Sequence, residues 1–178
     1  MKASPKITGF TAKDVVIIAV FVAATIAVQL ALSLVPGVEL VTVLFAAFSF
    51  SYGVKRGTLA ATAFSLLRQI VFGFYPTVLV LYLIYFNLFA LLFGLLGKRL
   101  KLPALLPLIV VIACVCTVCF SLIDCVLTPL WYGYSEKATA AYFKAALPFT
   151  IPQVICTAVS VGVLFFPLYK LFKLKKLS

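Results

Sequence analysis

Long apolar segments, separated by short clusters of polar and basic residues, run along the whole chain. Most of these segments approach the roughly 20 residues that a helix needs to cross about 30 Å of hydrocarbon. Pro, Gly and basic residues lie between them, as is typical of the ends of membrane helices. The pattern predicts six helices, over residues 14–34, 40–54, 58–74, 77–96, 104–127 and 142–171.

The predicted helix over 40–54 is short for a membrane span. At 1.5 Å per residue it is several Å shorter than the hydrocarbon layer, so it is either re-entrant or held by local thinning of the bilayer. Lys55 and Arg56 at its end favour a true crossing.

The predicted helix over 142–171 contains three prolines, Pro148, Pro152 and Pro167. We expect them to kink this helix rather than end it, because neighbouring helices can satisfy the freed backbone groups.

The composition indicates a chain that lies almost entirely in a membrane. Hydrophobic residues make up 65% of the 178 residues, charged residues make up 11%, and the mean hydropathy is +1.25. A soluble domain of this length needs far more polar surface. We therefore predict an all-α membrane protein, a compact bundle of six transmembrane helices that forms one domain over residues 1–178.

The basic residues predict an orientation for this bundle. The net charge is +11, and Lys and Arg in short loops mark the cytoplasmic side. With the N-terminus inside, twelve basic residues fall in cytoplasmic segments: Lys2, Lys6, Lys13, Lys55, Arg56, Lys98, Arg99, Lys101, Lys170, Lys173, Lys175 and Lys176. Only Lys137 and Lys144 fall in outer loops, and Arg68 lies within a helix. This bias predicts a multi-pass protein of the cell (plasma) membrane with both termini in the cytoplasm (N-in/C-in).

Four of the predicted helices carry a polar face. Positions three or four residues apart lie on one face of a helix, and polar groups in a bilayer turn toward the interior of a bundle. The four faces consist of Thr25, Gln29 and Ser33; Ala61, Ser65 and Arg68; Thr117, Ser121, Asp124 and Thr128; and Thr150, Gln153, Thr157 and Ser160. We expect all four faces to point into the bundle.

The buried charges and many aromatic residues gather in the outer half of the predicted bundle. A few polar groups among aromatic walls are typical of a small-molecule pocket, and charged residues inside a membrane are functional candidates. The predicted substrate-binding residues are Arg68, Glu39, Asp124, Gln29, Gln153, Asn87, Tyr75, Tyr82, Tyr85, Trp131 and Tyr132. We expect no catalytic residue, cofactor or metal site, since the chain has no histidine and its five cysteines suit small packing positions.

A structural role is the alternative for several of these residues. Arg68 either binds substrate or pairs with Asp124 or Glu39 to hold helices together. Asn87 shares a face with small residues, where a hydrogen bond between closely packed helices explains it as well as a ligand does. Tyr and Trp at the outer ends also suit an interfacial belt.

The first predicted helix has a second face, made of small residues. Ala19, Ala23, Ala27 and Ala31 recur every four positions. Thr25 lies about 200° around the helix from Ala23, so the alanine and polar faces are opposed. If the polar face points inward, the alanine face points outward, where small residues allow another helix to approach closely. The alternative is chance, because alanine is common in membrane helices.

Short motifs accompany these features: the Ala19 to Ala23 spacing, the segments 36–42 and 52–57, Arg68 followed by residues 72–74, and the segment 166–170. Together with the short length, six helices and basic inner loops, they resemble an S component over essentially the whole chain. An S component is the substrate-binding membrane subunit of an energy-coupling factor (ECF) type ABC transporter for vitamins or micronutrients.

The resemblance implies a high-affinity pocket near the extracellular side for one vitamin-like molecule. It also implies docking on a transmembrane coupling subunit through the small-residue face of the first helix, with energy from two separate ATPase subunits. We expect this chain not to be an enzyme, since it has no phosphate-binding glycine loop. The nickel and cobalt members of the family use histidine ligands, which are absent here, and the sequence does not identify the vitamin.

The alternative function is a stand-alone small-molecule carrier or channel without an ATPase partner. Such proteins usually have paired repeats or helices broken at the midplane of the membrane, and neither is visible in the sequence. An intramembrane enzyme needs a nucleophile with a base, or a metal site, and without histidine the usual arrangements are missing.

Overall fold

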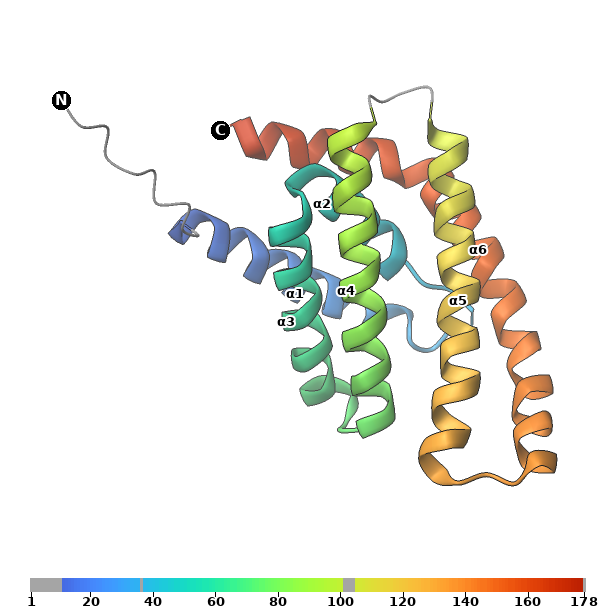
Figure 1. Ribbon diagram of the computed structural model, residues 1–178. Helices are drawn as coiled ribbons and strands as arrows, with labels where there is room; N and C mark the ends of the chain where they lie inside the picture. Colours follow the sequence, from blue (N-terminus) through green and yellow to red (C-terminus); the bar gives the residue numbers. More distant parts are fainter. Residues whose placement is uncertain (1–10, 36, 101–104, 178) are drawn as a thin grey trace.

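A computed structural model of the protein describes residues 11–35, 37–100 and 105–177, with side chains as far as residue 174. These ranges form six α-helices and no strand, as predicted: α1 (Ala12–Leu32), α2 (Val41–Tyr52), α3 (Val54–Phe72), α4 (Pro76–Arg99), α5 (Leu106–Tyr132) and α6 (Glu136–Leu177) (Figure 1). Several residues used in the sequence predictions lie outside the description: Lys2, Lys6, Pro36, Lys101, Ala104 and the side chains of Lys175 and Lys176.

Local sequence explains several helix ends. Thr11 and Asp14 form a capping box at the start of α1, in which each side chain accepts a hydrogen bond from the backbone N–H of the other. Pro76 begins α4, where its missing N–H costs nothing. The start of α6 was predicted six residues too late. Its first turn is polar, a pattern typical of a loop. The Ser135 hydroxyl nevertheless accepts a hydrogen bond from the backbone N–H of Ala138 and caps the helix there.

The long helix α6 remains continuous through Pro148, Pro152 and Pro167, as predicted. Figure 1 shows that it bends strongly, so that its last part runs across the bundle. Proline in a helix interior removes a hydrogen bond and crowds the preceding turn, which explains bending without termination.

Four helices of the described chain, α1, α4, α5 and α6, are long and apolar enough to cross a membrane. Helix α2 is also apolar but has only 12 residues, and α3 carries Lys55, Arg56 and Arg68 within its 19 residues. The protein is therefore an all-helical molecule with the composition of a membrane protein.

The short helix α2 is the centre of the bundle. It contacts each of the other five helices, and ten of its residues are buried. A helix that is apolar all round is expected to be buried in this way. Phenylalanines extend this core: the ring of Phe48 stacks on Phe21 of α1 with centroids 4.0 Å apart, and the ring of Phe45 lies 5.0 Å from Phe86 of α4.

Most of the Lys and Arg residues in the described ranges lie near one end of the molecule, which we call the basic end. Figure 1 shows that the α2–α3 turn, the end of α4, the start of α5 and the end of α6 lie together, opposite the α3–α4 and α5–α6 connections. An ion pair of 2.8 Å between Arg56 and Asp14 ties the start of α3 to that of α1. Tyr52, at the end of α2, packs against Phe172 of α6.

Candidate functional site

The polar faces predicted for the helices point into the bundle at most positions. Thr25, Ser65, Thr117, Thr157 and Ser160 are all buried. Two hydrogen bonds join the polar faces of α5 and α6, between the hydroxyls of Thr117 and Thr157 at 3.1 Å and of Thr150 and Ser121 at 3.0 Å. Ser33 differs in part from the prediction: it is exposed, because α1 ends at Leu32 and the Ser33 hydroxyl donates to the carbonyl of Leu30, although it lines the cavity described next.

A cavity of about 360 Å³ lies between the α1–α2 connection, the last turns of α3 and the middle of α6. This volume falls in the range of roughly 300–1,000 Å³ found for small-molecule sites. Its polar lining consists of Gln29, Ser33, Glu39, Arg68 and Gln153. The cavity thus unites four of the predicted substrate-binding residues, from three separate parts of the chain, and we call it the polar cavity.

Arg68 is held on one wall of the polar cavity by aromatic rings. Its guanidinium carbon lies 4.7 Å from the ring centroid of Phe72 and 4.4 Å from that of Tyr82. Its Nε donates a hydrogen bond of 3.2 Å to the side-chain oxygen of Gln29. Within the described chain no carboxylate lies within 4.0 Å of this cation, so the predicted alternative of an ion pair with Asp124 or Glu39 is not what the structure contains.

Glu39 lines the same cavity and is held by a different set of contacts. Its carboxylate accepts a hydrogen bond of 2.5 Å from the Thr42 hydroxyl, one turn along the chain. Its backbone is tied to α6, because the N–H of Glu39 donates to the Cys156 sulfur at 3.4 Å and the thiol donates to the carbonyl of Glu39 at 3.3 Å. Burial raises the pKa of the Glu39 carboxyl, and hydrogen bonds from Thr42 and Thr157 partly oppose this rise.

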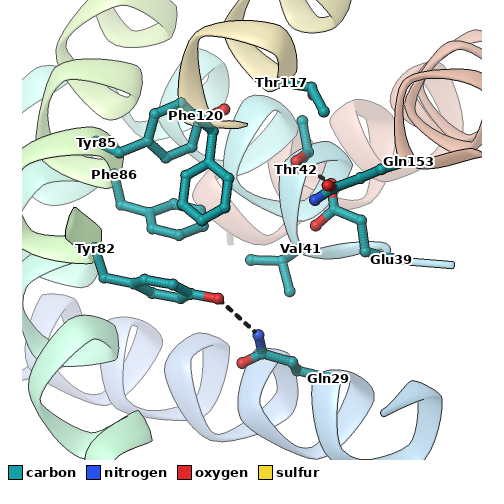
Figure 2. Close-up of a pocket in the computed structure, with 10 residues that line it drawn as sticks. All are labelled: Gln29, Glu39, Val41, Thr42, Tyr82, Tyr85, Phe86, Thr117, Phe120 and Gln153. Atoms are coloured by element: carbon teal, nitrogen blue, oxygen red, sulfur yellow. Dashed lines mark hydrogen bonds between the residues drawn. The ribbon is translucent and has the colours of Figure 1, made fainter. Parts of the chain in front are cut away.

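An aromatic wall closes the inner end of the site. A small space of about 20 Å³, enough for about one water molecule, continues inward from Gln29, Glu39 and Gln153. Figure 2 shows four rings on one side of it and the polar groups of Glu39 and Gln153 on the other. The rings belong to Tyr82, Tyr85, Phe86 and Phe120. The site therefore combines two charges and two amides with a wall of aromatic rings that meet one another at steep angles.

Asp124 lines a second cavity of about 360 Å³, between α5 and α6. Its carboxylate accepts hydrogen bonds from Thr128 at 2.9 Å and from Tyr142 at 2.8 Å. Gln153 lines this cavity as well as the polar cavity, so the two are neighbours.

Four predicted residues do not line the described cavities. Asn87 bonds across the α3–α4 seam to the Thr62 hydroxyl at 3.1 Å, which is its predicted structural alternative. The same seam is tight about two turns further along α4, since a methyl group on Gly94 would lie 2.6 Å from the backbone nitrogen of Val54. The other three, Tyr75, Trp131 and Tyr132, are exposed at helix ends, as an interfacial belt requires.

The structure adds residues that were not among the predicted site residues. Phe120 looks like an ordinary core position in the sequence, yet its ring centroid lies 4.8 Å from that of Tyr85. Cys156 resembled a packing residue. Thr42 follows Glu39 by three positions, a spacing that allows a hydrogen bond within one turn and is the one signal available in the sequence.

The alanine face of α1 is open. Ala19, Ala23, Ala27 and Ala31 are all exposed, whereas Thr25 on the opposite face is fully buried. The opposition of the two faces agrees with the helical spacing.

Gly37 holds the loop that carries Glu39 in close contact with α6. Its φ is +77°, and a methyl group there would lie 2.7 Å from the Cβ of Pro152. We expect Gly37→Ala to lower the free energy of unfolding by roughly 1–3 kcal/mol through backbone strain and to weaken ligand binding, because the loop must move away from α6. Thermal unfolding and ligand titration in detergent measure the two effects.

Gly133 provides the control for this prediction. It also has a positive φ, +63°, but a methyl group would meet nothing within 4 Å. Gly133→Ala should therefore lower stability without changing affinity. Equal affinities for the two variants would contradict the role of the Gly37 contact.

Comparison of the chain with protein-family models, with curated proteins and with solved structures finds no match. The function is therefore inferred from the chemistry of the site.

Proposed function

We propose that the protein is the substrate-binding subunit of an ECF-type ABC importer for a vitamin or related micronutrient. In this proposal the polar cavity binds the substrate near the extracellular side. A transmembrane coupling subunit docks on α1, and two partner ATPases supply the energy. The protein itself performs no chemical step.

The polar cavity is the observation that carries the proposal. Arg68 and Glu39, from distant parts of the chain, both line this cavity, which is large enough for a small molecule and lies beside an aromatic wall. Charges inside a membrane are costly and persist where they serve a function. A binding site explains why both charges line a cavity instead of pairing with each other.

The proposed topology is six spans with both termini in the cytoplasm. The grouping of Lys55, Arg56, Lys98 and Arg99 at the basic end supports it, because positive loops stay inside. The polar cavity includes the last turns of α3, away from the basic end, and would therefore open outward. Helix α2 crosses as the short central span, shielded from lipid by its neighbours.

Cysteine labelling tests this topology. In a cysteine-free background, Tyr134→Cys should react with a membrane-impermeant maleimide added to intact cells, because the α5–α6 connection lies outside. Arg99→Cys at the end of α4 should react only after the cells are permeabilised. Both native side chains are exposed, so access to the protein surface does not limit the reaction. The reverse result would overturn the proposed orientation.

Native mass spectrometry tests the function itself. Protein purified in mild detergent should retain one small molecule. The mass spectrum gives the mass of this molecule, and fragmentation identifies it. ATPase subunits should co-purify when the protein is isolated with its coupling subunit. Transport by the purified chain alone, reconstituted in vesicles without ATP, would instead support the stand-alone carrier or channel.

A further inference from the structure

We propose that the molecule bound in the polar cavity is bipolar, with an acidic group that binds Arg68 and a positively charged or hydrogen-bond-donating group that binds Glu39. This inference rests on the proposed function and names the chemical class of its substrate. It follows from how the two charges are held, from the groups between them and from the size of the cavity.

Neither Arg68 nor Glu39 has an oppositely charged partner within the described part of the protein. The only ion pair within 4.0 Å in that part joins Arg56 and Asp14 near the basic end. Arg68 has an amide and two rings around it, and the Glu39 carboxylate has hydroxyl groups. Rings and neutral dipoles position a charge but leave it able to bind an ion of opposite sign.

The two charges are also held apart. The guanidinium of Arg68 packs against the ring of Phe72 on the same helix, α3, and against the ring of Tyr82 on α4. The backbone of Glu39 is bound to Cys156 of α6, so its position depends on a different part of the bundle. Opposite charges on different parts of the bundle create an electrostatic field across the cavity. A ligand with an acidic group near Arg68 and a basic or donor group near Glu39 is favoured at both ends of this field.

This field discriminates against singly charged ligands. A purely anionic molecule large enough to fill the cavity places negative charge near Glu39, and a purely cationic one places positive charge near Arg68. Each leaves one protein charge unpaired, and an unpaired buried charge reduces affinity strongly. The Gln29 and Gln153 amides each donate and accept, so they tolerate the polar atoms between the two ends.

The size and lining of the cavity limit the ligand further. A volume of about 360 Å³ suits a compact molecule rather than a peptide or a lipid. The rings of Phe72 and Phe149 line the cavity itself and provide aromatic contacts for a ring in the ligand. The expected ligand is thus a small, ring-containing compound with an acidic end and a basic or amine-bearing end.

The molecule that the wild-type protein retains through purification is the probe for the test. Fragmentation should show both an acidic group and a basic or N–H-bearing nitrogen in it, a result that requires no variant to fold. Its affinity should fall roughly ten- to a hundredfold in Glu39→Gln, as expected when a hydrogen-bonded charge is lost. Arg68→Gln should show a loss of at least that size. Glu136→Gln, an equivalent change at an exposed acid at the start of α6, should bind like the wild type.

The possible results separate the inference from the proposed function. A retained molecule with an acidic group alone, bound equally well by wild type and Glu39→Gln, overturns the bipolar ligand and leaves the transport role intact. A wild-type protein that retains no molecule contradicts the proposed function, and the inference with it.

Discussion

Replacing Arg68 with alanine is expected to abolish high-affinity ligand binding while the protein still inserts into the membrane. The variant removes the only cation that lines the polar cavity among the described residues. Loss of one partner of a buried charged pair costs about 3–5 kcal/mol, which corresponds to about a hundred- to several-thousandfold in affinity. Titration of the purified protein with the molecule that the wild type retains measures this loss.

Two further variants show whether the effect comes from the guanidinium or from damage to the fold. Arg68→Lys keeps the charge but loses the planar group that packs against Phe72 and Tyr82, so its affinity should lie between those of wild type and Arg68→Ala. Arg99→Ala removes an exposed arginine at the other end of the molecule and should bind normally. Unchanged affinity in Arg68→Ala would show that Arg68 has a structural role only.

The helices were predictable because hydrophobic segments, and the Pro, Gly and basic residues that separate them, are local features of the sequence. The place of α2 was not. From its length, residues 40–54 looked like the least secure span, yet α2 is the helix on which the others pack. A short apolar helix is unstable alone in a bilayer but suits the middle of a bundle, and only the contacts of the complete fold distinguish the two cases.

The candidate site was predictable where helical spacing determines which way a side chain points. Gln29, Arg68 and Gln153 each belong to a polar face, and the three do meet in one cavity. Asp124 has the same spacing signal but lines a neighbouring cavity, because which polar faces meet depends on how the helices are arranged. Spacing says nothing about the bend of α6 or about the loop that brings Glu39 beside Cys156.

Helix α1 contributes to the inside and the outside of the bundle at once. Its inner face contributes Thr25 to the core and Gln29 to the polar cavity, where Gln29 bonds to both Arg68 and Tyr82. Its alanine face is left exposed. A partner subunit packed on that face would therefore be one helix diameter, about 10 Å, from the groups that line the polar cavity, close enough for the proposed docking and ligand release to be mechanically connected.

Ala23→Leu is accordingly expected to block assembly with the proposed coupling subunit and to leave ligand binding by the isolated chain unchanged. Close helix packing depends on small side chains, and a leucine holds the backbones apart. Because Ala23 is exposed and Thr25 faces inward, the larger side chain disturbs neither the core nor the polar cavity. Co-purification with the coupling subunit and ATPases measures assembly.

Ala24→Leu, at an exposed position about 100° around the same helix, is the matched control and should reduce assembly much less. Normal assembly and transport by Ala23→Leu would show that the alanine face is not the docking surface.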